Sequence, residues 1–118
     1  MVFIDEKVEN EMIDSFCRIF KVEKGSVEFS SGEGTDENKL TLKTHIELKD
    51  EAVDVDITFA MLDKNRASVI GEIISTKNSN PIRINQSYSG PAQYLPKAME
   101  RLLGKYKLKR GFFKGYLS

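Results

Sequence analysis

The chain has 118 residues, of which 40% are hydrophobic and 31% charged, as expected for one packed domain. Eighteen Lys and Arg residues balance 18 Asp and Glu residues, and this formal net charge of +0 counts against a dedicated nucleic-acid domain, which tends to be basic overall. The single cysteine, Cys17, excludes an intrachain disulfide framework and a thiolate zinc cluster, and without a run of roughly 18 apolar residues we expect a cytoplasmic protein with no membrane contact.

Residues 5–20 have the clearest helical pattern in the chain. Their apolar side chains recur at spacings of three and four, which places them on one face of a helix. Asp5 is expected to cap the N-terminus, and the acids Glu6 and Glu9 favour the positive end of the helix dipole. The predicted apolar face consists of Val8, Met12, Ile13, Phe16, Ile19 and Phe20.

Alternation of apolar and polar residues predicts antiparallel strands through the middle of the chain. A short strand over 26–30 precedes a polar, glycine-rich loop over 31–38. Residues 40–48 and 53–59 alternate on either side of the polar turn 49–51, which indicates a β-hairpin.

After a second turn over 63–66, residues 67–76 form the next predicted strand. The alternation is broken around Gly71, and this predicts a glycine bulge. Residues 77–90 are rich in Asn, Ser, Pro and Gly, and within them we expect only a short edge strand around 82–84.

The segment from Pro91 to Gly104 has the spacing of an amphipathic helix. Proline is acceptable in a first turn, so the helix begins either near Pro91 or at Pro96, and Gly104 is its expected C-cap. From Lys105 the sequence alternates again, which predicts a last strand or an extended arm.

These elements predict one α+β domain over 1–118. An N-terminal helix, an antiparallel meander of about four to five strands and a C-terminal helix would form a two-layer sandwich, with 105–118 as a basic aromatic tail or last strand. The acids Glu47, Asp54 and Asp56 would lie on the solvated face of the sheet.

Charge is segregated along the chain. Residues 91–118 contain seven basic residues and one acid, a net of +6, so the first 90 residues carry −6. Lys and Arg attract acidic protein surfaces or phosphates, and interleaved rings can stack on unpaired bases. The predicted binding residues, for a protein or a nucleic acid, are Lys97, Arg101, Lys105, Tyr106, Lys107, Lys109, Arg110 and Lys114. The alternative is that Tyr106 and the rings after it pack into the core and only the lysines are solvated.

A catalytic role finds little support in the sequence. Glu47-Leu48-Lys49 matches the Glu-x-Lys part of the restriction-endonuclease-like signature, in which carboxylates hold a divalent metal and the lysine orients a water. Asp36, which would supply the preceding acid, lies in a loop, and Lys49 lies at the hairpin turn. His45 is the single histidine and has no predicted catalytic partner.

We therefore expect no enzyme, no catalytic residue, no metal and no cofactor. The function predicted is that of a small binding module for a protein partner with an acidic surface. The alternative is a nucleic-acid-binding protein that uses the same basic C-terminal surface.

Overall fold

Helix α1 spans Glu6–Phe20, as the apolar spacing predicts. The computed structural model describes residues 2–31 and 38–107, and in it the Asp5 carboxylate accepts a hydrogen bond from the Val8 N–H at 2.9 Å. The predicted N-cap is thereby confirmed. Every residue of the predicted apolar face is buried, with Phe16 and Met12 fully inaccessible to solvent.

Five antiparallel strands follow in a meander, in which each strand pairs with the next along the chain. After a short 3-10 turn, η1 (Lys24–Ser26), the strands are β1 (Val27–Ser31), β2 (Lys39–Glu47), β3 (Ala52–Asp63), β4 (Arg66–Ser75) and β5 (Asn78–Ser89). The predicted hairpin is the β2–β3 pair, in which Leu42 lies opposite Ile57. The two fully buried side chains meet on the inner face of the sheet.

The predicted bulge at Gly71 is wrong. Gly71 pairs regularly with Ile57. The register shifts lie elsewhere, between Met61 and Asp63 of β3 and between Ile73 and Ser75 of β4. A Cβ at Gly71 would lie 2.2 Å from the Asp56 carbonyl oxygen. Glycine is therefore required because the backbone of β3 approaches closely at this point, not because the strand gains a residue.

Strand β5 is much longer than the short segment expected from its composition. Its regular pairing with β4 runs from Ile82, opposite Ile73, to Ser89, opposite Arg66. Ile84 and Tyr88 point into the core, while the residues between them are polar. Asn85, Ser87 and Ser89 thus occupy the outward positions of a half-buried strand, which composition alone did not distinguish from a loop.

The C-terminal helix begins at Leu95, close to the second of its two expected starts, and extends past its expected end at Gly104. A 3-10 turn, η3 (Ala92–Tyr94), leads into α2 (Leu95–Lys107). Pro96 is the second residue of α2, where its missing N–H costs no hydrogen bond. Gly104 is not a C-cap, because the helix continues to Lys107. Residues 105–107 therefore do not begin a strand or an arm, and 108–118 lie outside the described residues.

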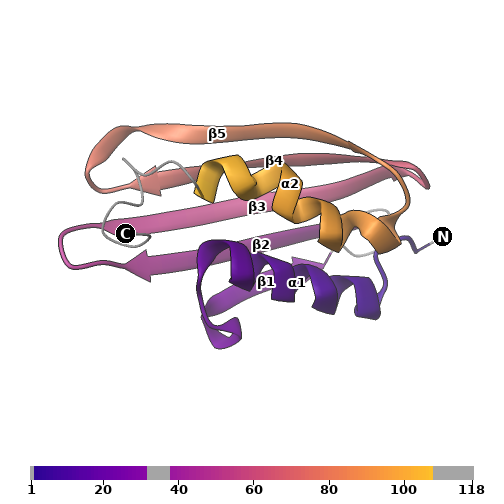
Figure 1. Cartoon of the computed structure of the whole chain (residues 1–118), viewed down its shortest axis with the longest axis horizontal. Helices are drawn as coiled ribbons and strands as arrows, with labels where there is room; N and C mark the ends of the chain where they lie inside the picture. Colours follow the sequence, from indigo (N-terminus) through magenta and orange to yellow (C-terminus); the bar gives the residue numbers. More distant parts are fainter. Residues whose placement is uncertain (1, 32–37, 108–118) are drawn as a thin grey trace.

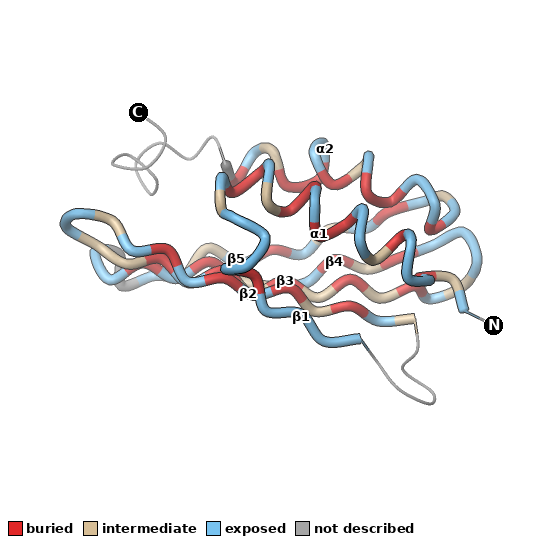
Figure 2. Tube along the Cα trace, turned by 90° about the horizontal axis from the view of Figure 1, so that it is seen from below, coloured by how far each residue is buried: buried red, intermediate tan, exposed pale blue. Residues whose placement is uncertain are grey.

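The two helices form one layer and the sheet the other, which confirms the predicted α+β sandwich. Figure 1 shows α1 over the β1–β2 side of the sheet and α2 over the β3–β5 side, running in the opposite direction to β5. Figure 2 shows the buried residues gathered between the layers. The other face of the sheet is covered by no described helix or strand and is mainly polar. Neither described helix combines the length and the apolar character that a bilayer span requires.

Candidate binding surface on helix α2

Three of the predicted binding residues form a line along α2. Lys97, Arg101 and Lys105 follow one another at intervals of four residues, and all three are exposed. Because an α-helix has about 3.6 residues per turn and rises about 1.5 Å per residue, the three side chains lie on one face at steps of about 6 Å. We call these three residues the α2 basic stripe.

The α2 basic stripe forms no ion pair within the described part of the chain. None of its residues has an ion-pair partner there, whereas Arg18 of α1 lies 3.7 Å from Glu100, measured from Nε to Oε1. Glu100 is the sole acid of α2, and this contact directs it toward α1. Residues 73–99, which include all of β5, contain no Asp or Glu. Acids of α1 nevertheless lie near one end of the stripe, because Lys97 lines a hollow together with Glu11 and Asp14. The positive potential of the stripe is therefore least compensated toward Arg101 and Lys105.

Two tyrosines adjoin the stripe and were not predicted as part of it. Tyr94 is 57% exposed, and together with Tyr88, Lys97 and Arg101 it lines a shallow hollow between α2 and β5. The Tyr88 hydroxyl donates a hydrogen bond to the Pro91 carbonyl at 2.8 Å. Burial raises the pKa of Tyr88, and the charge of Arg101 opposes that rise. The three-residue spacing of Tyr94 and Lys97 was the available signal, because such residues neighbour each other on a helix.

Tyr106 does not belong to the exposed surface, which agrees with the alternative in which its ring packs into the core. It is 5% exposed, and the Gln86 amide of β5 donates a hydrogen bond to its hydroxyl at 3.1 Å. In the helix, Tyr106 continues the buried face formed by Leu95, Met99, Leu102 and Leu103. The Lys105 ammonium lies 5.2 Å from the centre of its ring, a cation–π distance. Lys107 is the last residue of α2, and Lys109, Arg110 and Lys114 lie outside the described residues.

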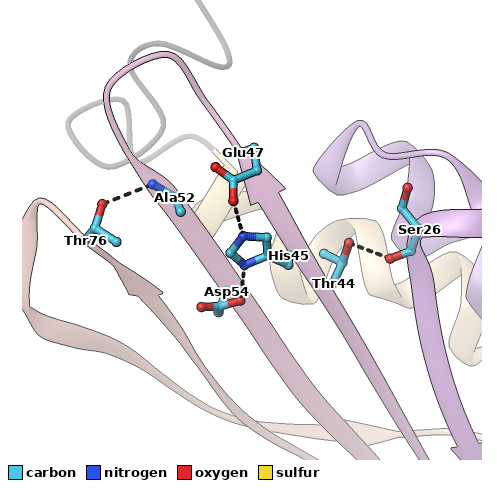
Figure 3. Close-up of polar contacts among 7 residues, drawn as sticks. All are labelled: Ser26, Thr44, His45, Glu47, Ala52, Asp54 and Thr76. Atoms are coloured by element: carbon cyan, nitrogen blue, oxygen red, sulfur yellow. Dashed lines mark hydrogen bonds and ion pairs between the residues drawn. The ribbon is translucent and has the colours of Figure 1, made fainter.

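On the opposite face of the sheet, His45 is held between two carboxylates (Figure 3). Its Nδ1 lies 2.6 Å from Asp54 Oδ1 on β3, and its Nε2 lies 2.6 Å from Glu47 Oε1 on β2. The β2–β3 register places His45 directly opposite Asp54. The hydrogen bond to Glu47, followed by that to Asp54, raises the pKa of His45 above its usual value of 6.5. The arrangement therefore favours an imidazolium that donates to both acids.

This cluster is poorly arranged for catalysis or for metal binding. A general base needs a ring nitrogen that faces its substrate, but both nitrogens of His45 face carboxylates. Glu47 and Asp54 contact opposite sides of the ring, so their oxygens do not converge on a common point (Figure 3). Across residues 2–31 and 38–107, no group of three or more His, Cys, Asp or Glu side chains is placed to hold a metal ion.

The surrounding hydrogen bonds in Figure 3 have a structural role. Thr44 Oγ1 donates to the Ser26 carbonyl at 3.0 Å, which ties β2 to the start of β1, and the Ala52 N–H donates to Thr76 Oγ1 at 3.0 Å.

Comparison with known proteins gives no match to a family model, a curated protein or a solved structure. The functional argument therefore depends on the chemistry of the α2 basic stripe and its surroundings.

Proposed function

We propose that this protein is a non-enzymatic, cytoplasmic binding module that recognises an acidic surface of a partner protein through the α2 basic stripe. The observation that carries the proposal is the alignment of three exposed cations along α2, none of which has an ion-pair partner among the described residues. Cations that serve only solubility are usually interspersed with acids, whereas a single-sign line provides electrostatic complementarity for a partner of opposite sign.

A protein partner is favoured over a nucleic acid by two features of the same surface. A run of stacked bases needs several exposed rings, but of the three tyrosines described near the stripe only Tyr94 is exposed, since Tyr88 and Tyr106 are each 5% exposed. The acids of the −6 segment also lie on the same small molecule, for example Asp54 on the outer face of the sheet, and they repel an extended phosphate backbone. Nucleic-acid binding stays the alternative, since Lys and Arg also contact phosphates.

The proposal is tested with poly-L-glutamate as a generic acidic chain. Binding is measured by fluorescence anisotropy for the wild type and for the double variant Lys97→Glu/Arg101→Glu, which reverses most of the stripe. The expected result is an affinity loss of roughly tenfold or more, because like charges then face each other. Lys49→Glu/Lys64→Glu is the matched control: it makes the same change in net charge in two exposed turns of the sheet and should bind like the wild type.

A single-stranded DNA of equal length distinguishes the alternative. If the stripe binds phosphates, the plot of log affinity against log salt should have a slope of about −2 for three contacts at about 0.7 each. Tighter binding of this DNA than of poly-L-glutamate, lost in the Lys97→Glu/Arg101→Glu variant, would favour the nucleic-acid alternative. Equal losses in the stripe variant and the turn control, or no binding of either polymer, would overturn the proposal.

A further inference from the structure

Strand β5 is an edge strand beside the α2 basic stripe. In the described part of the chain, β4 is the one strand that pairs with β5, so alternate backbone N–H and C=O groups along the other side of β5 face outward. The segment from Ile82 to Ser89 is regular, and it is long enough to template about eight residues of an added strand. Natural edges are often blocked by Pro, bulges or charges. Here Pro81 and the register irregularity lie at the start of β5, and Arg83 is the one charge of the regular segment.

We infer that the partner segment is an extended acidic peptide that adds to β5 as a sixth strand, with its acids facing the α2 basic stripe. This inference rests on the proposed function and adds the conformation and the register of the ligand. Main-chain hydrogen bonds to an edge strand supply affinity in this mode of recognition, and alternate side chains supply specificity.

The spacing of the stripe fits a strand. Every second side chain of a strand points to the same face, at intervals of about 6.7 Å. The cations of the stripe recur at about 6 Å along α2. Figure 1 shows α2 running along β5 in the opposite direction, so the two series of positions are roughly parallel. Carboxylates at alternate residues of an added strand would thus face Lys97, Arg101 and Lys105 in turn.

The stripe also lies close enough to β5 to reach an added strand. Tyr88 of β5 lines the same hollow as Lys97 and Arg101, and Gln86 is hydrogen-bonded to Tyr106 of α2 at 3.1 Å. A strand added to β5 would lie about 4.8 Å beyond it, within reach of long side chains that border the hollow between α2 and β5. On the other face of the sheet, Arg83 is exposed and would favour an acid at one of the outward-facing positions.

The other edge of the sheet rejects the same ligand. Strand β1 has five residues, includes Glu28, and lies beside α1, where Glu9 accepts a hydrogen bond from Ser31. An acidic strand would meet like charges there, so the choice of edge is set by repulsion as well as attraction. The same reasoning disfavours a second copy of this chain on β5, because pairing of two β5 edges would bring two basic stripes together.

The test uses a fluorescent peptide in which glutamate alternates with threonine, and the same peptide carrying N-methyl groups on alternate residues. Methylation removes the peptide amide donors that would face β5, but it keeps the charge and the order of side chains. The full chain should bind the methylated peptide about tenfold or more weakly, because several main-chain hydrogen bonds are lost. Backbone amide signals of 82–89 should shift in the NMR spectrum on addition of the unmethylated peptide, and those of β1 should not.

Separate outcomes identify which proposal fails. Equal binding of both peptides, with affinity still lost in Lys97→Glu/Arg101→Glu, would overturn the added strand and leave the acidic partner standing. Loss of discrimination between the stripe variant and the Lys49→Glu/Lys64→Glu control would overturn both. Preferential binding of single-stranded DNA, or concentration-dependent dimers that shift the same amides without peptide, would assign β5 and the stripe to another occupant.

Discussion

The helix face that holds the two layers together can be tested by replacing Phe16 with Ala. Phe16 is fully buried, and its ring centroid lies 4.9 Å from that of Phe20 in a tilted arrangement. A buried Phe removes at least about 150 Å² from water, which at about 25 cal/mol per Å² corresponds to about 4 kcal/mol. Part of that area is retained by Ala, while the cavity left behind adds a cost. We therefore expect the free energy of unfolding to fall by about 3–5 kcal/mol.

Phe29→Ala is the matched control, because Phe29 of β1 is 54% exposed. The same chemical change there should cost about 1 kcal/mol or less. Urea unfolding followed by circular dichroism measures both, with the slope m compared among the proteins so that only changes in stability are scored. A cost below about 1 kcal/mol for Phe16→Ala, or equal costs for the two variants, would refute the packing of α1 described above.

Two further predictions concern a glycine and a histidine. Gly71→Ala should destabilise the protein by about 1–3 kcal/mol or more, because its Cβ would lie 2.2 Å from the Asp56 carbonyl oxygen, which belongs to backbone and cannot easily move. Gly104→Ala, whose Cβ meets nothing within 4 Å, should instead stabilise α2 by about 0.5–1 kcal/mol, and a loss of stability there would contradict the helix beyond Gly104. The NMR titration of His45 should give a pKa above 6.5 that falls in Glu47→Gln. Since the folded-state pKa is raised, the stabilisation from this cluster should be complete below pH 6.5 and lost as the pH rises through the raised pKa. An unshifted titration would contradict the pairing of His45 with Glu47 and Asp54.

The sequence predicted the elements whose apolar period is strong. Helix α1, the β2–β3 hairpin and the apolar face of α2 were all located from spacing, because burial against the other layer requires that spacing. The prediction was weakest where inward residues were few. In β5, Ile84 and Tyr88 are separated by polar residues, and only pairing with β4 reveals that these residues form a strand.

The two glycines whose roles were predicted wrongly show why local sequence was insufficient to assign them. Gly71 lies in a regular strand and is required by the backbone of the neighbouring strand, which is distant in sequence. Gly104 has open space around it and does not end α2. The cost of a glycine inside a helix, about 1 kcal/mol, is smaller than the gain from burying the Tyr106 side chain two residues later. Both outcomes depend on tertiary packing, which a single sequence does not contain.

The continuation of α2 also changes which cations act together. In a strand from Lys105, alternate residues would share a face, and Lys105 would be grouped with Lys107 and Lys109. In the helix, Lys105 stands four residues after Arg101 and eight after Lys97, so it completes a line that begins beside Tyr94 and runs along β5. The basic character of the C-terminal segment was evident from composition, but its grouping is a consequence of the helix. Burial of Tyr106 thus both extends the core and keeps Lys105 on the helix, in register with Lys97 and Arg101.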